Sequence, residues 1–401
     1  MHTSVVCAYN ARQVNYAASY SDDTKSTVTT VSLQWVKGME LEKFDVVKYI
    51  TCGTFSVVYE IAYPEGDSRI SNTKWALKRF YLKNQFAVWC ALREHNVYVR
   101  LARVKQQSPF LCSLLQSLRM RGGPAFVLRK GSGFNLNNLI SIVGPLREKE
   151  AKFYSCEIIC GLEHLHAMHI VHLDLSLENV LIADSGHIFI TDFDRAYDMS
   201  GEPGPPKLAK LTKSAYFMAP EVRDGMKVTT KADMWSLGVL VATTIYGRMT
   251  ISGLLRRGGI SKDDFQHVST PLRLFFRTCL SPNRRRRMDI SNVKRLEFYE
   301  DVNWEEVMAC KLEPPYHPSQ IEARDPYRWG ACEGRPKQDP CDRLILAAAN
   351  RKCMPLIDEY LLDFRDRHGV RHLMEQPTCR RGLLRVGLTP ERINELFANF
   401  G

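Results

Sequence analysis

The stretch HLDLSLENVLIADSGHIFITDFD, which begins at His172 and ends at Asp194, restricts the fold more than any other part of the sequence. Two short apolar runs, VLI and IFI, are separated by the turn-forming residues DSG, and this pattern predicts two short paired strands. Asp174 and Asn179 precede the first run, and Asp192 follows the second. The sequence therefore predicts that three polar side chains gather at adjacent strand ends.

The bulk composition is that of a globular protein with a large core. A chain of 401 residues can form one two-lobed domain or two domains with appendages. No apolar run approaches the ~20 residues that a membrane span needs, and the run 236–247 predicts a buried helix instead. The first residues lack the features of a signal peptide. The twelve cysteines are therefore expected to be reduced thiols in a cytoplasmic or nuclear protein.

The net charge of +11 could favour an anionic partner. Part of this charge lies in the run Arg284–Arg287, which we interpret as a solvated loop with one arginine used structurally. A nuclear-import signal or an acidic-lipid patch is the alternative for such a short basic run. Nucleic acid is not an expected partner, because no basic motif is interleaved with aromatic residues.

The predicted elements form a small sheet with one helix, followed by a larger helical half. Residues 1–40 are rich in Ser, Thr and Val and are predicted to be irregular. Alternating apolar residues within 41–63 predict two antiparallel strands around a glycine turn. From Glu148 the pattern turns helical. Between them we expect a strand, a helix and two further strands, at 74–82, 88–104, 110–118 and 125–130.

Five motifs follow one another along the chain: WALK (75–78), HLDLSLEN (172–179), DFD (192–194), MAPE (218–221) and DMWSLG (233–238). Together they resemble the landmarks of a protein kinase catalytic domain over residues 44 to about 299. The resemblance implies an α+β fold with two lobes. A small lobe, 41–130, would hold an antiparallel sheet and one key helix, and a larger lobe, 131–299, would be mainly helical.

The resemblance implies a role for five residues in phosphoryl transfer. Lys78 would contact the phosphates of ATP, and Glu94, sixteen residues later on the predicted helix, would pair with it. Asp174 would accept or orient the proton of the substrate hydroxyl. Asn179 and Asp192 supply the oxygen ligands that Mg²⁺ prefers. ATP and Mg²⁺ are therefore the implied cofactors.

Two further contacts are implied by the same resemblance. His172 and Phe193 would stack with Tyr98 and link the two lobes. Glu221 would pair with a buried arginine, for which one of Arg284–Arg287 is the expected partner. Both contacts would be structural.

The segment TCGTFSVV (51–58) occupies the place of the kinase glycine-rich loop, whose bare backbone approaches the phosphates. Only the central Gly53 is present, because Thr51 and Ser56 replace the outer glycines. A weaker phosphate contact is expected, although the amide of a serine can still donate. The implied nucleotide-binding residues are Thr51, Cys52, Gly53, Thr54, Phe55, Ser56, Val58, Ala76, Lys78 and Leu181.

The segments 147–166 and 294–319 resemble the AGC group of kinases, which includes cyclic-AMP-dependent and ribosomal S6 kinases. An AGC-like tail is therefore expected at 300–334 and a helical appendage at 335–401. The final FANF (397–400) resembles the hydrophobic motif with which such tails dock on the small lobe. The alternative is the apolar face of a terminal helix.

Several residues depart from the kinase pattern. Leu173 replaces an arginine that grips an activation-loop phosphate, and Lys210 stands where the phosphorylated threonine is usual. We therefore expect a loop that is not ordered by the usual phosphorylation, with Thr212 and Ser214 as remaining possible sites. Ser176 replaces a lysine that neutralises the transferring phosphoryl group, and Asp194 replaces a glycine.

Two functions remain open on these residues. The first is a slow serine/threonine protein kinase that transfers the γ-phosphate of ATP to protein substrates. The second is a pseudokinase that serves as a nucleotide-binding, scaffold or regulatory module. Glu178 could recognise a basic residue of a substrate, but Asn135 and the basic pair Arg129 and Lys130 predict a weaker preference for arginine-rich substrates. The oligomeric state is left open.

Overall fold

A computed structural model gives the structure of the protein. It describes residues 45–62, 74–82, 84–120, 123–201, 215–256, 262–265, 267–324, 382–398 and 400. The expectations for 1–40, for Lys210, Thr212 and Ser214, and for 325–381 lie outside these residues.

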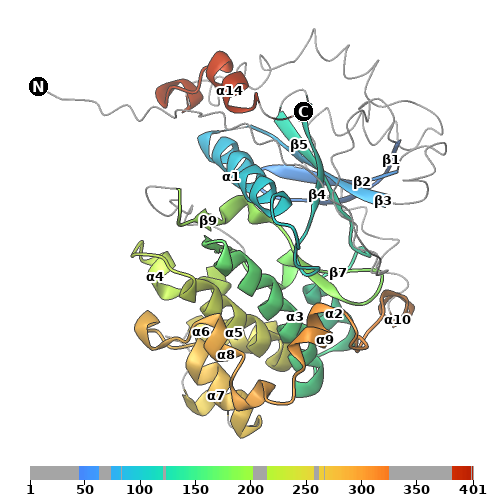
Figure 1. Ribbon diagram of the computed structural model, residues 1–401, viewed down its shortest axis with the longest axis vertical. Helices are drawn as coiled ribbons and strands as arrows, with labels where there is room; N and C mark the ends of the chain where they lie inside the picture. Colours follow the sequence, from blue (N-terminus) through green and yellow to red (C-terminus); the bar gives the residue numbers. More distant parts are fainter. Residues whose placement is uncertain are drawn as a thin grey trace, which may run out of the picture. The chain divides into compact units, whose positions relative to one another are not determined.

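The small lobe is a five-stranded antiparallel sheet with one long helix beside it (Figure 1). The strands follow the order β1-β2-β3-β5-β4. Val58 on β2 is paired with Lys78 on β3, and Lys78 is paired with Phe126 on β5. The elements are β1 (Asp45–Cys52), β2 (Ser56–Ala62), β3 (Lys74–Phe80), α1 (Gln85–Ala102), β4 (Leu114–Met120) and β5 (Gly123–Arg129).

The strand expected at 110–118 is wrong in its first part. Residues Phe110 and Cys112 bond to a different strand, since Ile190 N donates to Phe110 O at 2.9 Å and Cys112 N donates to Ile190 O at 2.8 Å. Regular pairing with β5 begins only at Leu114. The apolar run therefore divides between two sheets, which its sequence pattern alone cannot reveal.

Helix α1 begins three residues earlier than the apolar period predicted. Asn84 caps it, because its side chain accepts a hydrogen bond from Ala87 N at 3.0 Å. The buried face includes Ala87, Ala91, Glu94 and Tyr98, which recur at helical spacing. Glu94 is thus a carboxylate on an otherwise largely apolar face and needs a charged partner there.

The large lobe is built around α3 and α5, which are buried along most of their lengths. The predicted buried helix at 236–247 coincides with α5 up to Tyr246, and Cys156 and Cys160 are buried on α3. The α+β, two-lobed fold is confirmed. The helices are α2 (Leu136–Val143), α3 (Glu148–Ala167), α4 (Pro220–Arg223), α5 (Lys231–Tyr246), α6 (Arg248–Arg256), α7 (Thr270–Cys279), α8 (Ile290–Val293), α9 (Trp304–Met308) and α10 (Pro318–Arg324).

Two small antiparallel pairs carry the polar stretch from His172 to Asp194. They are β6 (Ile170–Val171) with β9 (Tyr197–Asp198), and β7 (Val180–Ile182) with β8 (Ile188–Ile190). The predicted pair of short strands is therefore confirmed. Within the described part of the chain, no helix combines the length and the apolar character that crossing a bilayer requires.

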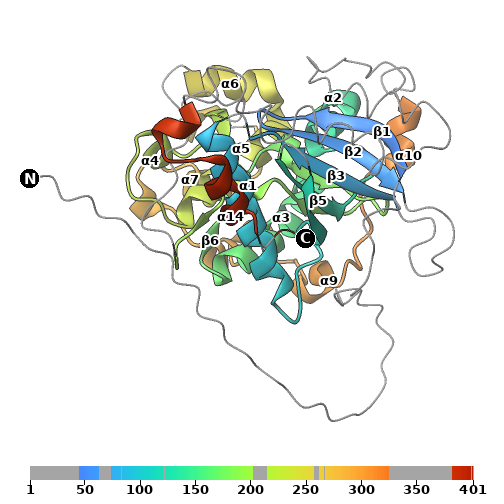
Figure 2. The same cartoon turned by 90° about the horizontal axis from the view of Figure 1, so that it is seen from above.

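The C-terminal segment packs on the small lobe. Helix α14 (Pro390–Leu396) lies beside α1 in two views (Figures 1 and 2). Phe400 stacks on His95 of α1 at a ring-centroid distance of 3.8 Å and on Phe126 of β5 at 5.8 Å. The predicted docking of the FANF motif is confirmed. Phe397 is also buried, so the apolar face of the terminal helix contributes to the same contact.

We predict that Phe400→Ala lowers the free energy of unfolding by about 3 kcal/mol, as expected for truncation of a buried aromatic side chain. Burial lowers the pKa of His95 to about 4. A depressed histidine pKa gives stability that is present above about pH 6.5 and is lost as the pH falls toward the folded pKa. Because Phe400→Ala exposes His95, the difference from wild type should be larger at about pH 7.5 than at about pH 5.

Denaturant unfolding at the two pH values measures this difference. Leu384→Ala is the control, since Leu384 belongs to the same terminal segment but is 44% exposed. It should leave the unfolding free energy nearly unchanged at both pH values. An equal loss for Phe400→Ala at both pH values would contradict the role of His95.

Candidate active site

The loop that carries Asp174 is held in place by a buried carboxylate. Asp233, at the start of α5, accepts hydrogen bonds from His172 N at 2.8 Å and Leu173 N at 2.9 Å. His166 Nε2 lies 2.9 Å from the same carboxylate. Burial acts to raise the pKa of Asp233, but the contact with His166 lowers it below its ordinary value. A charged Asp233 thus fixes Leu173, whose backbone has a left-handed φ of 61°.

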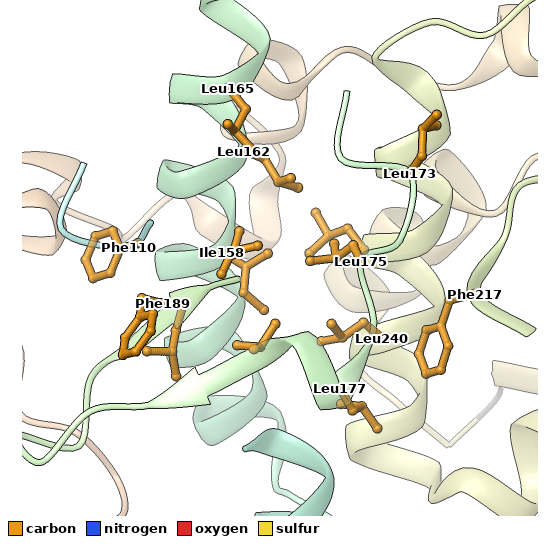
Figure 3. Packing of buried hydrophobic residues seen from close by; sticks show 14 of the residues in the cluster. Phe110, Ile158, Leu162, Leu165, Leu173, Leu175, Leu177, Phe189, Phe217 and Leu240 are labelled. Atoms are coloured by element: carbon orange, nitrogen blue, oxygen red, sulfur yellow. The ribbon is translucent and has the colours of Figure 1, made fainter. Parts of the chain in front are cut away.

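Alternate residues of this loop point into the core. Figure 3 shows Leu173, Leu175 and Leu177 among side chains of α3 and α5. Leucine at 173 is buried, so the place of a phosphate-gripping arginine is filled by an apolar side chain. The core contact leaves Asp174 partly accessible between these leucines. The leucines therefore fix the backbone from which the Asp174 carboxylate projects.

Asn179 and Asp174 are joined within the same loop. Asn179 Nδ2 donates to Asp174 O at 2.8 Å and approaches Asp174 Oδ2 at 3.4 Å. Because the amide nitrogen is used in these contacts, the amide oxygen is the atom of Asn179 that can serve as a metal ligand. The structure therefore brings these two predicted site residues together.

Lys78 contacts two carboxylates from different parts of the chain. Its Nζ lies 2.7 Å from Glu94 Oε2 and 2.5 Å from Asp192 Oδ1. Burial alone would lower the pKa of Lys78, but the charges of Asp192 and Glu94 raise it above its ordinary value. Burial raises the pKa of Glu94 to about 7, and Lys78 acts against that rise. The predicted Lys78–Glu94 pair is confirmed.

Asp192 lies at a sharp backbone turn after β8. Its φ and ψ are both 68°, a left-handed conformation that aspartate tolerates better than most residues. The next residue, Phe193, is fully buried and meets Tyr98 at 5.3 Å and His172 at 5.4 Å between ring centroids. The predicted stack of these three rings is confirmed. It fixes the turn and so aims the Asp192 carboxylate at Lys78.

Three carboxylates share the space beside Lys78. One oxygen each of Asp174, Asp192 and Asp194 lie within 4.8 Å of one another. Burial acts to raise the pKa of Asp192, but Lys78 lowers it. For Asp194, burial and then the charge of Asp192 raise the pKa well above its ordinary value. This excess of negative charge and oxygen ligands fits a hard divalent cation such as Mg²⁺.

The glycine-containing turn closes on itself between β1 and β2. Gly53 N donates to Ser56 O at 2.8 Å, and Gly53 is exposed. Phe55 is half-buried and packs against the core, while its carbonyl accepts from Tyr81 N at 2.8 Å. Thr51 and Thr54 are exposed on this turn. Residues 51–56 therefore form the hairpin that the sequence predicts, and their contact with phosphate stays a prediction.

Three further residues of the predicted nucleotide-binding set lie on three elements. Val58 on β2 is half-buried, Ala76 on β3 is buried, and Leu181 on β7 is half-buried. All three pack against the hydrophobic core that both lobes share. Their contact with a nucleotide stays a prediction, as does that of Cys52, whose backbone ends β1.

Two arginines near the site were missed by the sequence analysis. Arg195 Nε lies 3.4 Å from Asp174 Oδ2. Arg93 Nη1 donates to Asp194 O at 2.8 Å and so joins α1 to the turn after β8. The available signal was weak: Arg195 directly follows the DFD motif, and Arg93 directly precedes Glu94. Arginine side chains are long, so their partners are set by the fold.

The Glu221 pair is confirmed, and Arg287 is the partner. The two side chains form a hydrogen-bonded ion pair and are both buried. Arg285 and Arg286 are exposed. The basic run thus lies at the surface and holds the expected buried arginine, but a second residue, Arg284, is half-buried and donates to Lys227 O.

The sequence of residues 44–299 matches the protein kinase domain family. This match covers well over half of the chain, and the chain belongs to the protein kinase family. The lysine–glutamate pair, the loop with Asp174 and Asn179, and the turn with Asp192 are the parts of the fold that this family uses for phosphoryl transfer.

The similar curated proteins are kinases of the AGC type. A serine/threonine-protein kinase of Arabidopsis thaliana, AtPK2/AtPK19, is 26% identical over 75% of this chain and 64% of its own length. The ribosomal protein S6 kinase beta of Caenorhabditis elegans is 28% identical over 75% of this chain and 56% of its own length. Human protein kinase C delta type is 27% identical over 62% of this chain and 37% of its own length. The chain thus spans less than two thirds of these relatives. These relatives support the resemblance to AGC kinases that segments 147–166 and 294–319 indicated.

We predict that Lys78→Met lowers the free energy of unfolding by about 3 kcal/mol, because it leaves buried Glu94 without its compensating charge. Lys74→Met on the same strand is the matched control. Lys74 is 56% exposed and lies 3.1 Å from Glu60, which keeps Lys130 at 3.4 Å. The control should cost no more than about 1 kcal/mol. Urea unfolding measures both values, and equal losses would contradict the structural role of Lys78.

Proposed function

We propose that this chain is a serine/threonine protein kinase that transfers the γ-phosphate of ATP to hydroxyl groups of protein substrates. The observation that carries the proposal is the simultaneous contact of Lys78 with Glu94 and Asp192. In protein kinases the lysine–glutamate pair and the metal-binding aspartate must be in place together for catalysis. Here one ammonium group joins them.

The chemistry follows from the positions of the side chains. The substrate hydroxyl oxygen would attack the γ-phosphorus, and the bond from that phosphorus to the oxygen bridging to the β-phosphate would break. Asp174 would receive the hydroxyl proton, and ADP would leave with the electrons of the broken bond. Lys78 would hold the phosphates of the nucleotide.

The polar residues around Asp174 fit a magnesium-bound nucleotide. Asn179 and Asp192 would hold the ion, and its charge would neutralise the phosphates and the excess carboxylates of the site. Asp194 offers a further carboxylate where a glycine is usual. The ligand set therefore offers one more oxygen ligand than the family pattern, and a bound divalent ion would offset the repulsion from Asp192 that raises the pKa of Asp194.

Helix α1 is held to the activation segment without the arginine that usually precedes Asp174. Arg100 Nη1 lies 2.5 Å from Asp198 Oδ2 on β9, and Arg100 Nη2 donates to Met168 O at 2.6 Å. Arg93 makes the second tie, to Asp194 O. These contacts support an assembled site that needs no phosphate on the activation segment.

The test is transfer of labelled γ-phosphate from ATP with Mg²⁺ to a pool of basic peptides and to the protein itself. Wild type should incorporate phosphate slowly, because Ser176 lacks the charge of a lysine. Asp174→Asn should lower the rate by at least about 10²-fold, since it removes the proton acceptor. Asp184→Asn is the control: this exposed carboxylate lies on the turn between β7 and β8 and should have no effect.

The alternative function, a nucleotide-binding pseudokinase, has a distinct outcome in the same experiment. Protein that ATP and Mg²⁺ stabilise against heat, but that incorporates no more phosphate than Asp174→Asn, would overturn the proposed activity. A cytoplasmic or nuclear location is part of the proposal and is tested by fractionation of cells that express the chain.

The peptide-binding side carries an internal arginine. Arg248 Nη1 lies 2.5 Å from Glu178 Oε1 and donates to Asn137 Oδ1 at 3.1 Å. Glu178 was predicted to recognise a basic residue of a substrate, and in this arrangement Arg248 already occupies its carboxylate. The pair supports the proposal that arginine-rich substrates are only weakly preferred.

We predict that Arg248→Ala raises the rate for a peptide with arginine before the acceptor about fivefold relative to its alanine analogue, as expected for release of a half-exposed ion pair worth about 1 kcal/mol. Arg295→Ala, at an exposed position of the same lobe, should leave this ratio unchanged. The ratio of kcat/KM for the two peptides is the measurement. If the ratio is the same in Arg248→Ala as in wild type, Glu178 does not bind the arginine of the substrate.

A further inference from the structure

Arg195 carries a positive charge next to the carboxylates of the candidate active site. It ends the short 3-10 turn Phe193–Arg195, directly after the metal-binding region. Its side chain is 16% exposed, and its Nε lies 3.4 Å from Asp174 Oδ2 and 3.9 Å from Asp194 Oδ1. The guanidinium thus lies beside the carboxylate that receives the substrate proton.

One nitrogen of this guanidinium has no acceptor. Arg195 Nη1 is buried and makes no hydrogen bond within the described part of the chain. Asp194 Oδ1, close by, is likewise buried without a hydrogen bond. A buried donor without a partner is unfavourable, so the arrangement favours an anionic ligand whose oxygen accepts from this nitrogen of the guanidinium. Phosphate oxygens are the acceptors that arginine matches best.

The site lacks a cation at the usual position. Ser176 is buried, and its short, neutral side chain cannot supply a charge to the phosphoryl group. Lys78 is already engaged by two carboxylates. Fixed charges that act on the charge that develops during reaction accelerate other enzymes by about 10²-fold or more. A working site therefore needs such a group, and Arg195 is a charged side chain in contact with Asp174.

We propose that Arg195 is a catalytic residue that replaces the missing lysine: its unpartnered Nη1 group donates to an oxygen of the γ-phosphoryl group of ATP. As the new bond to the substrate oxygen forms and the bond to ADP breaks, Arg195 stabilises the charge on the transferring group. The hydroxyl proton passes to Asp174, and Arg195 keeps its own protons throughout. This inference deepens the proposed kinase activity and rests on it for the transfer step.

The competing interpretation is an ion pair that merely positions Asp174. The two roles differ in what they require of the nucleotide. A residue that binds the γ-phosphoryl group strengthens binding of ATP but not of ADP, because ADP lacks that group. A residue that only positions Asp174 affects ATP and ADP equally.

The experiment measures the Kd of MgATP and of MgADP by calorimetry for wild type, Arg195→Met and Arg195→Lys, with Arg295→Met as the exposed control. Arg195→Met should weaken MgATP binding about tenfold relative to MgADP, the size of one lost charge-assisted contact. Arg195→Lys should retain part of the difference, and the control should retain all of it. An equal change for both nucleotides, or none, would overturn the assignment.

Phosphate transfer by the same proteins provides the second measurement. Arg195→Met should lower kcat about 10²-fold, with a smaller effect on the KM for peptide. Adding Ser176→Lys to Arg195→Met should recover part of kcat. The two proposals fail separately. If wild type transfers no phosphate but Arg195→Met selectively loses MgATP affinity, the kinase activity is refuted and Arg195 remains the γ-phosphate-binding residue.

Discussion

The ammonium group of Lys78 is the interaction on which the rest of the site depends. It joins β3 to Glu94 on α1 and to Asp192 after β8, so one charge fixes a strand, a helix and a turn of the other lobe. Glu94 is buried on a largely apolar face, and Lys78 supplies the opposite charge that makes its own charge tolerable there. The contact between the rings of Tyr98 and Phe193 then holds α1 beside the turn after β8, so that Lys78 can reach both carboxylates.

Much of the site could be predicted because its signals are local. The spacing from Asp174 to Asn179 is set by one loop, and Asp192 follows a strand whose alternation is visible in the sequence. The prediction of a strand at 110–118 was wrong in its first part because Phe110 and Cys112 bond to Ile190, which lies almost eighty residues further along the chain. The contacts of Arg195 and Arg248 could not be predicted for the same reason. The partner of a long side chain depends on the fold of the backbone around it.

The departures from the kinase pattern belong to one redistribution of charge. Ser176 removes a cation from the loop with Asp174, and Asp194 adds a carboxylate to the neighbouring turn. Arg195 and Arg93 bring positive charge back from the other side, one to the Asp174 carboxylate and one to the Asp194 backbone. Each substitution alone removes a cation or adds a carboxylate. Together with the two arginines, the site still keeps cations in contact with carboxylates. The departures therefore change where cations and carboxylates lie within the site.

The tie between α1 and β9 has a consequence for control of the protein. In the usual kinase, the charge that fixes the activation segment is a phosphate, which another enzyme attaches and a phosphatase removes. Here the corresponding charge is Asp198, translated with the chain and paired with Arg100. The Asp198 carboxylate is present from synthesis and stays for the lifetime of the polypeptide. This contact therefore forms without a modifying enzyme, and a phosphatase cannot remove it.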